Sequence, residues 1–224
     1  MNAASPVGVL ALQGDFEKHL QLLRALGAQA APVRAPEALS GLAGLVIPGG
    51  ESTTIGMLMQ RFGLLDAVRD AVGRGMALFG TCAGAILLAQ EIENSVQPRL
   101  GLMDITVIRN AYGRQIESFE AVLTTPETSR QKTPQTGTAG AVQRNSDDES
   151  PFGGQAVTAV FIRAPVISRV GAGVTVLAEF ESRPVLVRQG RLLAATFHPE
   201  LTENGAIHRY FLNMALSANE GRGG

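Results

Sequence analysis

The strongest constraint on the fold is an apolar run that leads into the only cysteine of the chain. Residues 77–80 (Ala-Leu-Phe-Gly) are typical of a buried strand, and residues 83–88 (Ala-Gly-Ala-Ile-Leu-Leu) of a helix. Cys82 lies on the turn between them, with Gly80 and Gly84 two positions away on either side. Glycines relieve the crowding of a sharp strand-to-helix turn. The stretch therefore predicts an elbow that presents the cysteine sulfur to a ligand.

The residues that follow Cys82 suit nucleophilic chemistry. The backbone N–H groups of Ala83 and Gly84 open the helix without intrahelical partners, so they can stabilise a thiolate or an oxyanion. The alternative is a buried structural cysteine, which is the more common role of an isolated free cysteine. The two glycines and the strand-to-helix context favour the nucleophile.

The first half of the chain alternates buried strands with amphipathic helices. We expect strands at 7–12, 30–33, 45–47 and 77–80, and helices at 16–26, 53–61 and 64–74, with Asp15 capping the first helix. This alternation predicts an α/β fold with an open, mostly parallel sheet flanked by helices. The single domain spans residues 1–219, and 220–224 form a frayed tail.

The second half is richer in strands. We expect strands at 105–108, 118–123, 157–162, 174–180, 184–189 and 192–197, several of them antiparallel, and a last helix at 206–218. Residues 125–155 are rich in Thr, Gln, Ser, Gly and Pro, and they cannot bury enough apolar surface to offset the entropy of ordering. We interpret this segment as a flexible insertion rather than a functional lid.

Composition excludes several classes of protein. The net charge is −1 and no basic stripe is present, so we expect no nucleic-acid partner. No apolar run reaches the roughly 18 residues of a membrane helix, and a single cysteine predicts a reducing, cytoplasmic setting. Without a CxxC or HExxH pattern, we expect neither a metal nor a cofactor.

A base for Cys82 is present in His198-Pro199-Glu200, which follows the apolar strand that begins at residue 192. In an extended segment, residues two apart point to the same side, so Glu200 can hold the imidazole of His198. The alternative is a surface histidine at a strand end. Because Cys82 and His198 both follow strands, and ligands of open α/β sheets bind at the carboxyl ends of strands, a Cys-His-Glu triad is favoured.

A third stretch, Pro48–Ser52, also follows a strand. Two successive glycines let the backbone approach a ligand and present N–H groups to an anion. The amides of Gly50 and Ala83 are therefore our candidates for an oxyanion hole. A plain turn between strand and helix is the alternative, since a Gly-Gly pair is common.

Together these stretches resemble the glutaminase subunits of pyridoxal 5′-phosphate synthase, within the triad-type class I glutamine amidotransferases. The resemblance spans nearly the whole chain and rests on Val9–Gly14, Pro48–Thr54, Phe79–Gly84, Arg109-Asn110, Gly113–Gln115, Ser118–Glu120, Phe161–Pro165 and Phe197–Thr202. The elbow and the His-x-Glu pattern are shared by the wider superfamily. The Gly-Gly-Glu-Ser-Thr-Thr and Phe-Ile-Arg-Ala-Pro stretches are typical of this subfamily, and residues 125–155 are the main departure from its pattern.

The resemblance implies a flavodoxin-like fold and the hydrolysis of L-glutamine to glutamate and ammonia. Cys82 would form a γ-glutamyl thioester, while His198 serves as base and then protonates the leaving ammonia. The implied glutamine-binding residues are Gly50, Glu51, Ser52, Arg109, Ile162 and Arg163. Gln13 would lie near a partner interface and help to set the oxyanion hole. The implied partner is a (β/α)8-barrel synthase subunit in a hetero-oligomeric complex, which receives the ammonia and makes pyridoxal 5′-phosphate.

Three other hypotheses compete with this one: a glutaminase subunit of another complex such as imidazole glycerol phosphate synthase, a non-catalytic module, and a cysteine hydrolase of peptides. The subfamily stretches, the intact triad and the arginines argue against them in turn. His19 and His208 fall on predicted helices without a partner at useful spacing, so we expect surface or boundary positions for both. Tyr112 and Phe119 are interpreted as packing residues.

Overall fold

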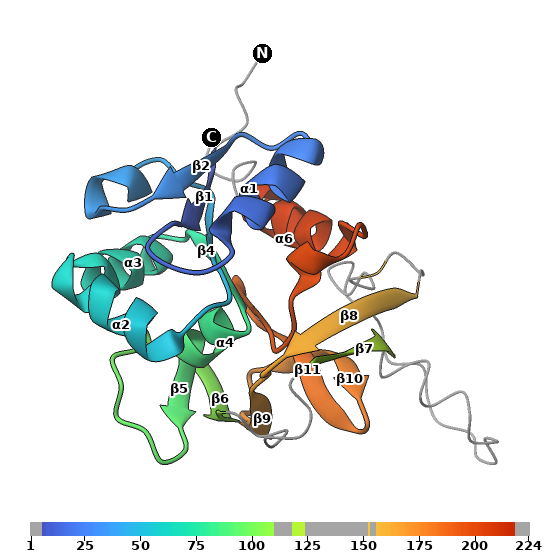
Figure 1. Cartoon of the computed structure of the whole chain (residues 1–224). Coiled ribbons are helices and arrows are strands. Elements are labelled where there is room, and N and C mark those ends of the chain that lie inside the picture. The colour runs from blue at the N-terminus through green and yellow to red at the C-terminus, as the bar shows by residue number, and fades with distance from the viewer. Residues whose placement is uncertain (1–5, 110–117, 124–151, 153–155, 218–224) are drawn as a thin grey trace, which may run out of the picture.

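The computed structural model describes residues 6–109, 118–123, 152 and 156–217 (Figure 1). Its centre is a seven-stranded sheet with the order β10-β11-β12-β4-β3-β1-β2. The strands are β1 (Val7–Leu10), β2 (Ala30–Val33), β3 (Gly44–Ile47), β4 (Ala77–Thr81), β10 (Thr175–Phe180), β11 (Arg183–Gln189) and β12 (Leu192–Ala195). Strands β2, β1, β3, β4 and β12 are parallel, whereas β11 and β10 are added antiparallel at one edge. The expected α/β fold with a mostly parallel sheet is confirmed.

Helices and smaller sheets cover both faces of the main sheet. The helices are α1 (Phe16–Ala25), α2 (Ser52–Arg61), α3 (Leu64–Gly73), α4 (Ala83–Leu88) and α6 (Ala206–Leu216), with single 3-10 turns η1 (Pro36–Leu39) and η2 (Pro199–Leu201). One face packs against α2, α3 and α4, and the other packs against α1 and α6. Figure 1 shows α1 and α6 next to each other on their side of the sheet.

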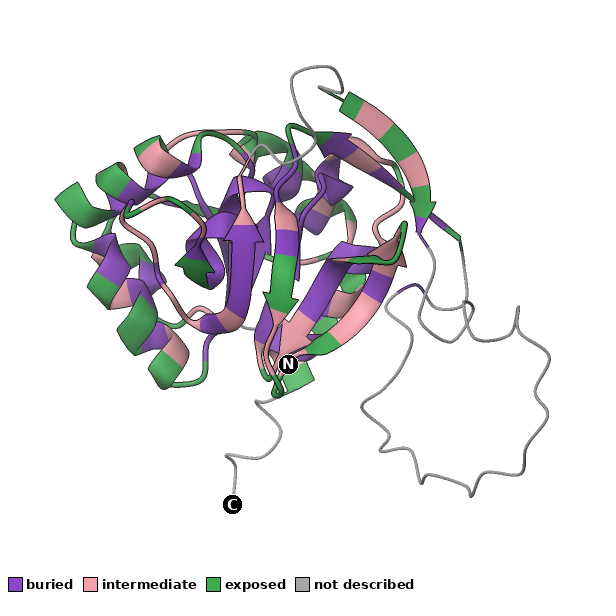
Figure 2. Ribbon diagram, turned by 90° about the horizontal axis from the view of Figure 1, so that it is seen from below, coloured by how far each residue is buried: buried purple, intermediate pink, exposed green. Residues whose placement is uncertain are grey.

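The core consists of two apolar clusters separated by the main sheet. Strand β3 shows why: Leu45 and Ile47 point into one cluster, Val46 points into the other, and all three are fully buried. A strand buried on both faces needs this continuous apolar sequence. Figure 2 shows the resulting buried interior, with exposed residues gathered on the outer faces of the helices.

Two smaller sheets flank the site end of the molecule. Strands β5 (Ala89–Ile92), β6 (Met103–Ile108) and β9 (Val166–Val170) form one, and β7 (Ser118–Leu123) pairs antiparallel with β8 (Val157–Ile162) in the other. Sequence analysis missed β5 and β9, because both are short and β5 carries two exposed polar residues that hide its pattern. Phe119 stacks on Phe161 with ring centroids 4.7 Å apart, which confirms its packing role.

Several predictions fall outside the described residues: Tyr112, the tail at 220–224, and all of the insertion at 125–155 except Phe152, which is buried. Among the described helices, none combines the length and the apolar character that a membrane crossing requires.

Candidate active site

The cysteine elbow forms where β4 ends and α4 begins. Cys82 has φ 47° and ψ −102°, a left-handed backbone conformation that non-glycine residues rarely adopt. The neighbouring glycines permit it: a Cβ at Gly80 would overlap the backbone of Gly84, and a Cβ at Gly84 would overlap the carbonyl of Ile47. The predicted elbow is confirmed, and its strain indicates a functional position.

The sulfur of Cys82 faces two residues that sequence analysis placed at the site. The Sγ lies 3.7 Å from the carbonyl oxygen of Ile162, at the end of β8, and the Cys82 side chain is close enough to His198 to raise the pKa of its imidazole. Arg163 follows Ile162 with φ 45° and an exposed side chain. The structure therefore brings the β8 end to the nucleophile, and Ala83 is buried directly behind it at the start of α4.

His198 and Glu200 form the predicted pair, but on a different backbone. The Nδ1–H of His198 donates to Oε1 of Glu200 at 2.8 Å, and both residues are buried. The expected extended segment is wrong, because Pro199–Leu201 forms a 3-10 turn with His198 at its N-cap. The tight turn folds the chain back and so brings His198 and Glu200 into contact. The alternation of side chains along an extended strand is not the cause.

Burial and charge act in opposite directions on this pair. Burial alone would lower the pKa of His198, but its contacts with Cys82 and Glu200 outweigh that effect and raise the pKa to about 10. For Glu200, an acid, burial alone would instead raise the pKa, yet His19 and His198 hold that pKa well below its usual range. The site therefore favours an imidazolium between a carboxylate and the sulfur.

The Gly-Gly loop contacts this pair directly. A Cβ at Gly49 would overlap the ring of His198, so the backbone of the loop lies close against the imidazole. The neighbouring Gly50 has φ 152° and packs against the side chain of Gln13. Gln13 Oε1 accepts the backbone N–H of Glu51 at 2.9 Å, which fixes the loop beside the triad. Gln13 is thus a loop-positioning residue in this structure.

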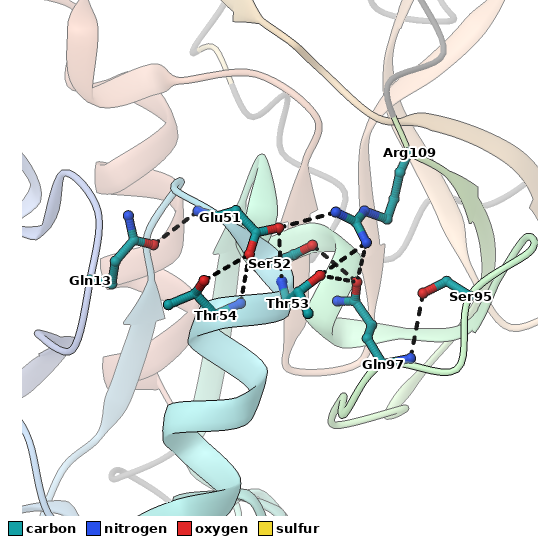
Figure 3. A network of polar contacts seen from close by, with 8 residues as sticks. All are labelled: Gln13, Glu51, Ser52, Thr53, Thr54, Ser95, Gln97 and Arg109. Carbon is teal, nitrogen blue, oxygen red and sulfur yellow. Dashed lines mark hydrogen bonds and ion pairs between the residues drawn. The ribbon is translucent and has the colours of Figure 1, made fainter.

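Glu51 joins the loop to α2 and to Arg109 (Figure 3). Its carboxylate caps α2 by accepting the backbone N–H groups of Thr53 at 3.2 Å and Thr54 at 2.7 Å. Arg109, which follows β6, lies 3.1 Å from the same carboxylate through Nη2. Burial is the largest single influence on Glu51 and opposes its ionisation, but the hydrogen bonds from Thr54 and Thr53 together outweigh it and lower the pKa of Glu51. The predicted residues Glu51 and Arg109 are therefore adjacent charges of opposite sign.

Sequence analysis missed Gln97, which ties this network together. Its Oε1 accepts from Arg109 Nη1 at 2.7 Å, Thr53 Oγ1 at 3.2 Å and Ser52 Oγ at 3.3 Å (Figure 3). Gln97 is buried, and within the described part of the chain its Nε2 has no hydrogen-bond partner. Gln97 precedes Pro98 in an irregular connection, so nothing in the local sequence pattern marks it.

The expectation for the two remaining histidines is wrong. His19 on α1 and His208 on α6 are both fully buried, and His19 Nδ1 lies 2.8 Å from His208 Nε2. The two residues are far apart in the sequence, so spacing rules within one helix could not reveal the contact.

One group of potential metal ligands exists among the described residues. It combines Asp15 with His198 and Glu200, whose ligand atoms lie within 4.8 Å of one another. Because His198 and Glu200 already use Nδ1 and Oε1 to bond each other, this group fits a hydrogen-bonded pair better than a metal. That the protein needs no metal stays a prediction.

Comparison with known proteins identifies the family. The model of the SNO glutamine amidotransferase family matches residues 9–217. Proteins named pyridoxal 5′-phosphate synthase subunit PdxT are 51% identical in Pelotomaculum thermopropionicum, covering 96% of this chain and 97% of the relative, and 52% identical in Thermus thermophilus, covering 93% and 97%.

A solved structure of a glutamine amidotransferase is 50% identical, with a TM-score of 0.79, and covers 93% of this chain and 98% of that one. A structure of PurLQS from Thermotoga maritima, 15% identical with a TM-score of 0.65, covers 94% of this chain and 99% of that one and shares the fold. The elbow, the flavodoxin-like sheet and these full-length similarities lead to one assignment. This chain belongs to the SNO glutamine amidotransferase family.

Proposed function

We propose that this chain hydrolyses L-glutamine to glutamate and ammonia, as the glutaminase subunit of a pyridoxal 5′-phosphate synthase. The observation that carries the proposal is that the buried, hydrogen-bonded pair of His198 and Glu200 lies beside the buried Cys82 on its strained elbow. Full-length relatives about 50% identical, named as subunits of that synthase, support the assignment of the complex. The same relatives argue against imidazole glycerol phosphate synthase as the complex.

The chemistry follows from the charges at the elbow. The Cys82 sulfur forms a bond to the side-chain carbonyl carbon of glutamine, and the C–N bond breaks as His198 gives its proton to the leaving ammonia. Water, deprotonated by His198, then attacks the thioester, releasing glutamate and restoring the sulfur. Glu200 holds the imidazole ring and stabilises its charge throughout.

The neighbouring residues suit an amino-acid substrate. An α-amino acid carries a carboxylate and an ammonium group, which complement the guanidinium of Arg109 and the carboxylate of Glu51. Gly50, Ser52, Ile162 and the exposed Arg163 line the same region in our proposal. The amides of Gly50 and Ala83 are the proposed donors to the oxyanion that forms during attack.

The free ammonia needs an acceptor, which we propose is a (β/α)8-barrel synthase subunit in a cytoplasmic hetero-oligomer. Residues of the described helices and of all three sheets pack into the two apolar clusters on either side of the main sheet, which supports residues 1–219 as one domain.

Ammonia release from L-glutamine, measured with the full chain alone and with the barrel subunit, tests the proposal. We expect release that increases when the subunit is added and that the Cys82→Ala variant lacks. Release that is unchanged by the subunit would contradict the assignment of the complex, and undiminished release from Cys82→Ala would contradict the mechanism.

A further inference from the structure

A chain of buried polar groups continues behind the triad, away from the substrate side. Glu200 accepts from His198 through Oε1, and its other oxygen, Oε2, lies 3.3 Å from His19 Nε2. His19 Nδ1 in turn lies 2.8 Å from His208 Nε2. We propose that His19 and His208 are positioning residues that hold the Glu200 carboxylate in the orientation His198 needs. This inference rests on the proposed glutaminase function.

Because Glu200 and His19 are buried, the carboxylate of Glu200 needs a polar partner from the protein. The side chains of Glu200 and His19 are both 0% exposed, so water cannot compensate the carboxylate. A buried charge requires polar partners on each of its oxygens. Among the described residues no hydrogen bond of good geometry reaches Oε2, and the Nε2 of His19 is shared with Thr81 Oγ1 at 3.2 Å. His19 is therefore the residue that offsets the second carboxylate oxygen.

His208 determines which nitrogen of His19 carries a proton. Burial is the largest cause that lowers the pKa of His208, to about 3, so this imidazole is neutral near pH 7. Its Nδ1 is buried without a partner among the described residues, so a proton there would be an unsatisfied donor. The proton therefore sits on Nε2 and is donated to His19 Nδ1. A neutral His19 then carries its own proton on Nε2, which faces Glu200.

The groups around Glu200 show why a lost N–H would affect catalysis. His198 and His19 face it directly, Thr81 contacts it through His19, and the exposed Asp15 at the start of α1 lies near it. Strand β8, which also packs against the Pro199–Leu201 turn, contributes no charged side chain. Without the His19 N–H, a desolvated Glu200 would bind a proton more readily and could no longer stabilise the imidazolium of His198.

Two matched polar variants separate positioning from packing. The amide of His19→Gln can place an N–H near the position of Nε2, toward Glu200, whereas the amide of His19→Asn reaches only toward His208. With the barrel subunit present, we expect His19→Asn to lower kcat by roughly 10- to 100-fold, with little change in KM. For His19→Asn, the acid limb of the pH profile of kcat/KM should move to higher pH. His19→Gln should retain most of kcat and the wild-type pH profile.

Alkylation of Cys82 by iodoacetamide as a function of pH gives a readout that needs neither glutamine nor the partner. We expect the reactive form of Cys82 in His19→Asn to develop at higher pH than in wild type and His19→Gln. If wild type released no ammonia, the proposed function would fail, while the alkylation profile would still decide the inference. Thermal unfolding of each variant verifies that the compared proteins are folded.

His208 provides the second test, because it acts through His19. We expect His208→Leu to lower kcat less than His19→Asn, and the double variant to be no worse than His19→Asn alone. Equal losses in His19→Asn and His19→Gln, or wild-type kcat and pH profile in His19→Asn, would overturn the inference. Strictly additive losses in the double variant would contradict the role of His208.

Discussion

Two polar networks flank the Gly49-Gly50 loop, and they differ in their access to water. In the buried network, His198, Glu200, His19 and His208 are enclosed, and the Glu200 side chain is 0% exposed. In the loop network around Glu51 and Arg109, the two side chains are 49% and 29% exposed. Both networks join segments that are distant in the sequence.

The difference in solvent exposure indicates that the two networks have different roles in the site. An exposed ion pair contributes about 0–1 kcal/mol. Breaking the Glu51–Arg109 pair therefore costs little, and each residue can bind a charged group of a substrate instead. A buried carboxylate without its partners is strongly destabilising, so Glu200 must keep its partners. The loop network is therefore suited to binding, and the buried network to holding protons in fixed places.

The largest effect should follow from changing the centre of the buried network. Glu200→Gln replaces the acceptor of the His198 Nδ1–H and places an amide N–H against either His198 or His19. We expect kcat to fall on the order of 10³-fold or more, with KM changed far less. Steady-state ammonia release with the barrel subunit measures both. A comparable rise in KM would contradict the assignment of catalysis to the buried network and of substrate binding to the loop network.

The buried network should also make the stability of the protein depend on pH. The pKa of His208 falls from 6.5 in the unfolded chain to about 3, so the unfolded state binds more protons in this window and stability drops as pH falls below 6.5. The pKa of His198 rises from 6.5 to about 10, so its contribution is complete below 6.5 and is lost as pH rises toward 10. The depressed pKa of Glu200 adds to the loss below 4.5.

We therefore expect the free energy of unfolding, measured by urea denaturation, to be largest near pH 6.5. His208→Leu should flatten the decline between pH 6.5 and 4.5, where His208 dominates. Glu51→Gln serves as the control from the exposed network and should leave the shape of the curve in this range unchanged. A curve of unaltered shape in His208→Leu would show that this histidine does not titrate as described.

A smaller effect is expected from Arg109→Lys in the loop network. Lysine keeps the charge but cannot bond Glu51, Thr53 and Gln97 from one planar group. We expect KM for glutamine to rise about tenfold, with kcat within about twofold of wild type. A fall in kcat at constant KM would place Arg109 with the catalytic groups instead.

The smallest effect should come from Gln97→Leu. This variant removes an acceptor shared by Ser52, Thr53 and Arg109, but it also removes the unpartnered Nε2 from the interior. Because the unsatisfied Nε2 donor is lost together with the Oε1 acceptor, part of the free-energy cost of losing the acceptor is offset. We therefore expect KM for glutamine to rise about threefold. A KM equal to that of wild type would argue against this role.

The parts of the site that the sequence predicted are local. Cys82 with its flanking glycines, and His198 with Glu200, are each contained in a few consecutive residues whose pattern dictates their geometry. Even there the backbone of the His-Pro-Glu segment differed, because a 3-10 turn and an extended strand can both bring residues two apart together.

The missed parts depend on packing between distant elements. His19 and His208 are 189 positions apart and meet because α1 and α6 cover the same face of the sheet. Gln97 reaches its partners from an irregular connection. A polar residue on a helix has the same sequence pattern whether it faces water or a buried partner, so only the tertiary structure separates the two cases.

In the proposed mechanism, Cys82 carries the γ-glutamyl group during hydrolysis. Acid-quenched mixtures of the protein, the barrel subunit and L-glutamine, analysed by mass spectrometry of the intact chain, test it most directly. We expect a species heavier by one γ-glutamyl group, located on Cys82, which accumulates in Glu200→Gln or wild type and is absent from Cys82→Ser. Ammonia release with no adduct, or an adduct on another residue, would contradict the account.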